Sequence, residues 1–185
     1  MEIGGKYYIQ YLNGDDNGLT ELVKAYSVGL TLYLNGIVNH MQIAEDLMEE
    51  TFFKIITKKP KYNGKSSFKT WLYTIGRNVA FDYLRKNKRY IQIPDEDFNN
   101  CVQEENELYD SYIKEERKIY VHRSLKKLNP DYRQVLWLLY FEELSNKEVG
   151  MIMKKSSKQI KNLVYRAKLA LKKELQKEGF VYEEL

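Results

Sequence analysis

Apolar residues in the first half of the chain recur at three- and four-residue steps, the spacing that gathers side chains on one face of an α-helix. One such series runs from Leu19 to Tyr33, after two adjacent aspartates, either of which can cap it. Further series run from about Gln42 to Thr57 and from about Phe68 to Lys88. Between these two, a proline and an Asn-Gly pair predict a loop over 58–67.

The composition changes near the middle of the chain. Residues 91–106 are rich in acids and asparagine and contain little that a core could bury, which is typical of a linker. Beyond them, Asn129 places a capping side chain before Pro130, and this pair predicts a helix from Asp131 to Phe141. We therefore expect an all-α protein with two small helical domains, over residues 1–90 and 119–178. We expect a flexible acidic linker over residues 91–118 to join them.

The segment from 144 to 172 has the pattern of a helix-turn-helix. Ser145 and Glu148 have the spacing of a capping box, in which two side chains satisfy free backbone N–H groups at a helix start. Gly150 is small enough for a close helix crossing, and Ser156 can cap the second helix. The apolar face of that second helix consists of Ile160, Leu163, Val164, Ala167 and Leu171.

The polar face of the second helix carries side chains suited to DNA. Gln, Asn and Arg can make bidentate contacts with purine edges, and lysines can neutralise phosphates. A merely solvated face is the alternative, but such helices usually mix Glu with Lys, and this one has nearly no acids before Glu174. The candidate DNA-binding residues are Lys158, Gln159, Lys161, Asn162, Tyr165 and Arg166.

The net charge of +4 is modest, but the charges are segregated along the chain. Residues 1–53 hold eight acids and two bases, whereas residues 54–90 hold eleven Lys and Arg against one acid. Residues 91–118 are acidic again, with nine acids and three bases, and residues 144–177 carry ten bases and two acids. Two basic blocks separated by an acidic stretch indicate two contacts with one polyanion.

The features that would support other functions are scarce. Nothing approaches the roughly 18 consecutive apolar residues of a membrane helix, and the N-terminus lacks the pattern of a secretory signal. The lone Cys101 offers no thiolate cluster, and His40 and His122 are far apart in sequence. We therefore expect a cytoplasmic protein without membrane insertion, metal, cofactor or catalytic residues, and not an enzyme.

Several stretches resemble the conserved regions of bacterial sigma factors, in that family's order and spacing. AEDLMEETFFK (44–54) is similar to the polymerase-binding helix of the second sigma region. FKTWLYTIGRNVAFDYLRK (68–86) is similar to the helix that melts the promoter and contacts its downstream element. LNPDYRQVLWLLYFEELSNKEVGMIM (128–153) with SSKQIKNLVYRAKLALKKEL (156–175) resembles the fourth region. The absence of a segment the size of the third region matches the small extracytoplasmic-function (ECF) group.

The resemblance implies roles for the N-terminal motifs. In the family, the first motif docks on the clamp coiled coil of the largest polymerase subunit, and the matching residues here are Asp46, Glu49, Glu50 and Phe53. The basic loop and helix after it are implied to contact the downstream promoter element, with lysines on phosphates and aromatic rings on unpaired bases. A place in the core is the alternative for Trp71 and Tyr73. The implied residues are Lys58, Lys61, Tyr62, Lys65, Lys69, Trp71, Tyr73, Arg77, Asn78 and Arg85.

The resemblance thus implies a sigma factor that binds core RNA polymerase at the clamp coiled coil and the flap, and starts transcription at promoter DNA. An anti-sigma factor is a candidate further partner. Lys154 departs from the family, which usually has glycine in this turn. Two alternatives are a free-standing helix-turn-helix regulator with a ligand-sensing N-terminal half, and a metal-dependent nuclease. The nuclease would use Glu45 and its acidic neighbours, but the sequence supplies no convincing acid-base or nucleophile set.

Overall fold

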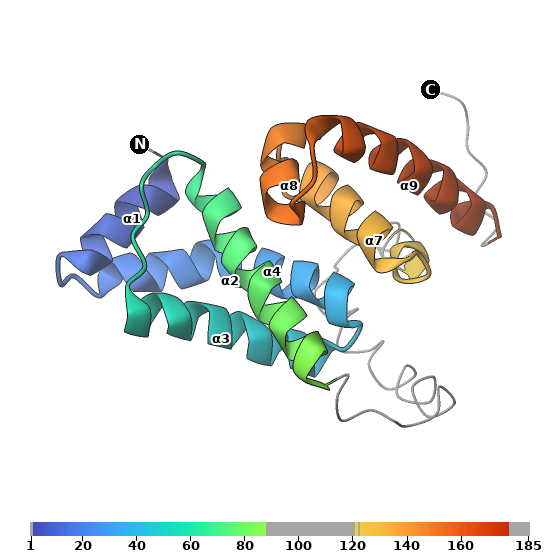
Figure 1. Ribbon diagram of the computed structural model, residues 1–185. Coiled ribbons are helices and arrows are strands. Elements are labelled where there is room, and N and C mark those ends of the chain that lie inside the picture. The colour runs from blue at the N-terminus through green and yellow to red at the C-terminus, as the bar shows by residue number, and fades with distance from the viewer. Residues whose placement is uncertain (1, 88–120, 122, 178–185) are drawn as a thin grey trace.

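The computed structural model describes residues 2–87, 121 and 123–177 (Figure 1). The N-terminal half contains four helices: α1 (Ile3–Leu12), α2 (Asn17–Val38), α3 (Met41–Lys58) and α4 (Phe68–Asn87). The C-terminal half contains α7 (Pro130–Leu136), the π-helix η2 (Trp137–Phe141), α8 (Asn146–Met153) and α9 (Ser157–Lys177). No strand occurs within the described ranges. The prediction of an all-α, two-domain fold is confirmed, while the predicted linker over 91–118 lies outside the described residues.

Helix α2 is central to the N-terminal domain, because it contacts α1, α3 and α4. Its predicted apolar positions Leu22, Tyr26 and Leu30 are buried. The N-cap is Asp16, one of the two aspartates expected there, although its side chain makes no capping bond. The helix ends at Asn39, whose left-handed backbone is a common way to close a helix.

The spacing of apolar residues did not predict helix α1. Two adjacent glycines, Gly4 and Gly5, lower its intrinsic helix propensity. Gly4 is needed here, because a Cβ at this position would collide with the Tyr26 hydroxyl and the Phe68 ring. Tyr8 is completely buried, and its hydroxyl donates to the Pro60 carbonyl at 2.7 Å. Packing against its neighbours, not local propensity, therefore accounts for this helix.

The predicted helix over 131–141 begins as expected but ends differently. Asn129 Oδ1 accepts from Tyr132 N at 2.9 Å, and proline occupies the first helical position. From Trp137 onward the helix widens into η2, where Glu142 N donates to the Trp137 carbonyl at 3.1 Å. The Trp137 and Phe141 rings stack with centroids 4.4 Å apart. Such π-turns are rare and are frequently found at functional sites.

The two domains contact each other in this structure. Helix α8 lies against α4, and α7 lies against α2 (Figure 1). The buried apolar residues of both domains form one cluster, from Tyr8 in α1 to Ala167 in α9. The arrangement of the domains therefore determines which surfaces of each are exposed.

Candidate nucleic-acid and polymerase interface

The C-terminal helix-turn-helix consists of α8 and α9, and its predicted capping box is confirmed. Ser145 Oγ accepts from Glu148 N at 3.3 Å, and Glu148 Oε2 accepts from Ser145 N at 3.0 Å. The turn passes through Lys154, whose φ of 55° lies in the left-handed region that costs a non-glycine residue roughly 1–2 kcal/mol. A Cβ on Gly150 would lie 2.6 Å from the Lys155 carbonyl oxygen, so only glycine fits there. The tight turn therefore forms with lysine in the usual glycine position.

Helix α9 separates its apolar and polar residues as predicted. Ile160 and Ala167 are completely buried, and Leu163, Val164 and Leu171 pack against the core. The candidate DNA-binding side chains are all exposed, and they are Lys158, Gln159, Lys161, Asn162, Tyr165 and Arg166. The helix thus presents a basic, hydrogen-bonding side away from its own domain.

Gln159 has a local role that the sequence analysis missed. Its Oε1 accepts from Ser156 N at 2.8 Å, while Gln159 N donates to Ser156 Oγ at 3.2 Å. Ser156-x-x-Gln159 is therefore a second capping box, and its Ser-x-x-Gln spacing could have revealed it. Because the amide oxygen is used within the protein, a bidentate contact from Gln159 to a base would require breaking this bond.

The loop before α4 forms the predicted Asn-Gly turn. Asn63 Oδ1 accepts from Lys65 N at 3.0 Å, and Gly64 has a φ of 69°. Five predicted DNA contacts at the end of α3, in this loop and on α4 are exposed, namely Lys58, Lys61, Lys65, Asn78 and Arg85. Arg85 pairs with Asp82 at 2.9 Å on the surface of α4.

Two other predicted contacts on α4 bind the C-terminal domain instead of facing solvent. Lys69 Nζ lies 3.0 Å from Glu142 Oε2. Arg77 Nε donates to Gln134 Oε1 at 3.1 Å, and the guanidinium lies 4.2 Å from the Phe81 ring centroid. Sequence spacing could not show these contacts, because both partners lie in the other domain.

The structure corrects the prediction for Tyr73 and constrains two other aromatic side chains. Tyr73 is completely buried, with its ring centroid 5.3 Å from that of Tyr33, so in this arrangement of the domains it belongs to the core and cannot stack on a base. Burial raises the pKa of Tyr73 well above 10, and the adjacent Glu142 raises it further. Tyr62 and Trp71 are half-buried, with ring centroids 5.4 Å apart. Only parts of these two rings are accessible.

The acidic motif on α3 is accessible. Asp46, Glu49 and Glu50 are exposed, and Phe53 is 63% exposed, which is unusual for a phenylalanine. Glu50 pairs with Lys54 at 2.8 Å. Three acids beside an exposed aromatic ring form a surface that suits a basic, partly apolar partner.

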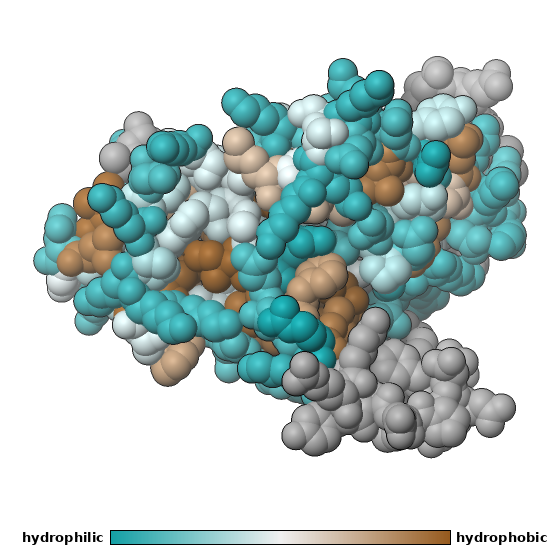
Figure 2. Space-filling model, in the orientation of Figure 1, coloured by the Kyte–Doolittle hydropathy of each residue, from teal (hydrophilic) through white to brown (hydrophobic). Residues whose placement is uncertain are grey.

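An apolar groove on the C-terminal domain was not predicted from the sequence. Its volume is about 540 Å³, and hydrophobic side chains are visible between α7 and α9 among polar ones (Figure 2). Tyr140 is 54% exposed and Leu169 is 47% exposed. The sequence signal that could have indicated the groove is Leu169, an apolar residue on the otherwise polar side of α9. The groove is lined by Val121, Leu125, Leu136, Tyr140, Phe141, Tyr165, Lys168, Leu169, Leu171 and Lys172.

The described residues contain neither a metal-binding cluster nor a membrane-spanning helix. No group of three His, Cys, Asp or Glu side chains there is placed to hold a metal ion. In the same part of the chain, every helix is too short or too polar to cross a membrane.

Comparisons with known proteins agree with this architecture. Residues 22–90 match the family model "Sigma-70 region 2", and residues 118–171 match "Sigma-70, region 4". The ECF RNA polymerase sigma factor SigM of Bacillus subtilis is 32% identical over 158 residues, which are 83% of this chain and 93% of SigM. The RNA polymerase sigma factor YlaC of the same bacterium is 28% identical over 87% of this chain and 94% of YlaC.

Two solved structures share the fold. The sigma factor RpoE from Bartonella quintana, in complex with the anti-sigma factor NepR, has a TM-score of 0.66 and 21% identity over 85% of this chain and 96% of RpoE. CnrH, in complex with the cytosolic domain of CnrY, has a TM-score of 0.64 and 18% identity over 95% of this chain and 98% of CnrH. The two family matches and the SigM relationship show that this chain belongs to the sigma-70 family, in its ECF group, and directs RNA polymerase to promoters to initiate transcription.

Proposed function

We propose that this sigma factor divides promoter recognition between its two domains. Helix α9 contacts the upstream, minus-thirty-five element, and the loop over 59–67 with α4 contacts the downstream element. The observation that carries the proposal is the exposed basic and amide-bearing side of α9, directly after a tight turn. The proposed boundaries are 1–90 for the N-terminal domain, 91–118 for the linker and 119–178 for the C-terminal domain.

On α9, the proposal separates side chains that read bases from those that bind phosphates. Asn162 and Arg166 have the chemistry for bidentate contacts in the major groove. Lys158 and Lys161 flank them and contribute phosphate contacts that depend on salt but not on sequence. Gln159 contributes its amide NH₂ group, since its oxygen caps the helix.

In the N-terminal domain, Lys58, Lys61 and Lys65 are proposed to follow the phosphate backbone. The accessible parts of Tyr62 and Trp71 are proposed to contact an unpaired base. Each such contact contributes roughly 1–3 kcal/mol, which is comparable with the few kcal/mol needed to extrude a base. Binding energy alone can therefore support local melting, so we propose that the chain needs no catalytic group and is not an enzyme.

Core polymerase is proposed to bind two separate surfaces. The acidic side of α3, with Asp46, Glu49, Glu50 and Phe53, suits the clamp coiled coil of the largest subunit. The apolar groove of the C-terminal domain suits an apolar segment of the flap, because its lining is mostly hydrophobic with two lysines at its edge, Lys168 and Lys172. Since its partner polymerase acts in the cytoplasm, we place this protein there.

We further propose an anti-sigma factor as a regulatory partner. RpoE was solved with its anti-sigma factor NepR, and this chain shares its fold across 85% of its own length. A pull-down from the source organism at endogenous expression, followed by mass spectrometry, would identify such a partner.

Transcription by purified core polymerase tests the proposed function. Core enzyme alone and core enzyme with this protein are given genomic DNA, and transcript starts are sequenced. The proposal predicts a discrete set of starts that requires the protein, with a shared upstream element and a shared downstream element. A start profile that the protein does not change would refute it, and a shared upstream element alone would remove the role assigned to α4.

A further inference from the structure

Helix α1 precedes the segment that matches the family model of the second region, which begins at residue 22. The chain between α3 and α4 nevertheless runs along this helix (Figure 1). This stretch is the loop over 59–67, and it carries Lys61 and Lys65, two of the lysines proposed to follow the phosphate backbone. The contacts of α1 therefore affect how the loop is presented to DNA.

One hydroxyl group of α1 holds the beginning of this loop. Tyr8 is completely buried, and its Oη donates to the Pro60 carbonyl oxygen at 2.7 Å. Proline has no N–H, so this carbonyl is its only backbone hydrogen-bonding group. Burial raises the pKa of Tyr8 to about 12, with a smaller effect from Tyr11. The hydroxyl therefore keeps its proton at neutral pH and remains a donor.

The ring of Tyr8 supports the aromatic side chains beside the loop. Its centroid lies 5.3 Å from that of Trp71 and 5.7 Å from that of Phe68. Tyr62 completes the group, with its ring centroid 5.4 Å from that of Trp71. Since Tyr62 and Trp71 are the rings proposed to contact an unpaired base, Tyr8 packs directly against one of the two.

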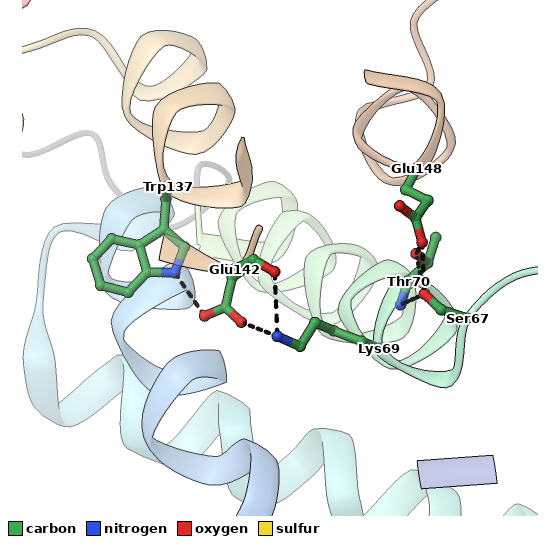
Figure 3. A network of polar contacts seen from close by, with 6 residues as sticks. All are labelled: Ser67, Lys69, Thr70, Trp137, Glu142 and Glu148. Atoms are coloured by element: carbon green, nitrogen blue, oxygen red, sulfur yellow. Dashed lines mark hydrogen bonds and ion pairs between the residues drawn. The ribbon is translucent and has the colours of Figure 1, made fainter. Parts of the chain in front are cut away.

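The second half of the loop is held by other bonds. Tyr62 Oη donates to the Ser66 carbonyl at 2.7 Å. At the start of α4, Ser67 Oγ accepts from Thr70 N at 3.2 Å and lies 2.9 Å from Glu148 Oε1 of the C-terminal domain (Figure 3). Tyr8, by contrast, ties the beginning of the loop to the N-terminal domain itself.

We infer that Tyr8 is a positioning residue for the downstream element, because its hydroxyl and its ring hold the loop over 59–67 and Trp71 in the arrangement that binds DNA. A loop that is ordered before DNA arrives loses less conformational entropy on binding, so its affinity is higher. Tyr8 is completely buried, so it acts only through the loop and Trp71. The inference rests on the proposed function in one respect, that this loop and α4 contact the downstream element.

The test uses the full chain bound to core polymerase, with Tyr8→Phe, which removes the hydroxyl and keeps the ring. The probes are two fluorescein-labelled single-stranded oligonucleotides. One carries the downstream element of a promoter mapped with the parent protein, and the other carries the same bases in scrambled order. Fluorescence anisotropy measures the affinity for each.

We expect Tyr8→Phe to weaken binding to the downstream-element probe about fivefold, the effect of one hydrogen bond. Binding to the scrambled probe should weaken less than about twofold, because it depends on phosphate contacts that exposed lysines can make in several loop arrangements. The preference for the downstream element should therefore fall. A variant that is merely less folded would lose affinity for both probes alike.

The matched control is Tyr11→Phe, the same change on the same helix. The Tyr11 hydroxyl donates to the Ile56 carbonyl inside α3 at 3.4 Å, so the control should bind both probes as the parent does. Thermal unfolding checks that each variant is folded.

Three results would overturn the inference: unchanged affinity in Tyr8→Phe, an equal loss for both probes, or the same loss of preference in Tyr11→Phe. A failure of the proposed function is recognised separately, because the parent itself would then show no preference for the downstream element over the scrambled probe. The inference would fall with it.

Discussion

The two helices proposed to contact DNA differ in what surrounds them. On α9, all six candidate side chains are exposed, whereas on α4 Lys69 and Arg77 bind the C-terminal domain and Tyr73 is buried. Helix α4 has α2 and α3 on one side and α8 on the other, while α9 packs on α7 and α8 within its own domain. The amphipathic pattern of a helix therefore describes its packing within its own domain, whereas the accessibility of its polar side depends on the second domain as well.

The largest effect is expected on the free energy of unfolding, for which a buried tyrosine of α4 is compared with an exposed tyrosine of α9. Tyr73→Ala removes a completely buried ring and should lower the free energy of unfolding by about 3–5 kcal/mol, the range for buried Phe or Trp to Ala. Tyr165→Ala, at a side chain that is 68% exposed, should change it by less than about 0.5 kcal/mol. Urea denaturation of both variants measures the difference. Equal stability would show that Tyr73 is not part of the core.

Charge reversal on the exposed side of α3 should weaken polymerase binding without affecting the fold. Asp46→Lys combined with Glu49→Lys reverses two charges facing a basic partner, and should weaken core binding by about 100-fold, or ~2.7 kcal/mol. Fluorescence anisotropy with labelled protein measures the affinity, and thermal unfolding checks the fold. Undiminished binding by a folded double variant would contradict the assignment of this surface.

On α9, replacing either of two basic residues, Arg166 and Lys161, should impair DNA binding in a different way. Arg166→Ala should cost about 1–3 kcal/mol at the upstream element and relax base preference there. Lys161→Ala should weaken binding to all sequences alike and reduce the salt dependence by about one unit of slope. Selection from a randomised DNA library at two salt concentrations distinguishes them. If the Arg166 variant selects the same sequences as the parent, this residue does not read bases.

The smallest expected effect is a pH dependence of the interdomain contact. Burial raises the pKa of Glu148, but hydrogen bonds from Ser145, Ser67 and Thr70 outweigh it and hold the pKa below 4.5. A depressed folded-state pKa means that the stabilising contribution is complete above pH 4.5 and is lost as the pH falls through the lower value. Energy transfer between one fluorophore attached to α1 and another attached to α9 should therefore decrease on acidification, and less so in Glu148→Gln. Identical pH profiles for the two proteins would exclude Glu148 as the titrating group.

The features that sequence could predict are those encoded locally. The Ser145–Glu148 capping box, the Asn129–Pro130 helix start and the apolar face of α9 each depend on residues within one or two turns of each other. The exposure of the α9 candidates followed from the same pattern. These local signals agree with one another, which is why the all-α fold and the helix-turn-helix could be predicted without the structure.

The features that could not be predicted depend on residues far apart in the chain. Nothing near Glu142 indicates that it will enter the N-terminal domain beside Lys69, 73 residues away. Tyr73 fits a polar, exposed position by spacing, but the second domain and α2 together bury it. The π-turn η2 likewise has no clear sequence signal, although it positions Glu142. Contacts between domains therefore limited the prediction more than helix assignment did.

Footprinting of one mapped promoter tests whether α9 is available to DNA in the free protein while α4, whose Lys69 and Arg77 bind the C-terminal domain, is not. Hydroxyl-radical cleavage is compared for the free sigma factor and for the same protein with core polymerase. We predict protection of the upstream element alone by the free protein, and of both elements once polymerase is bound. Protection of both elements by the free protein, or no protection of the upstream element in either state, would contradict the account.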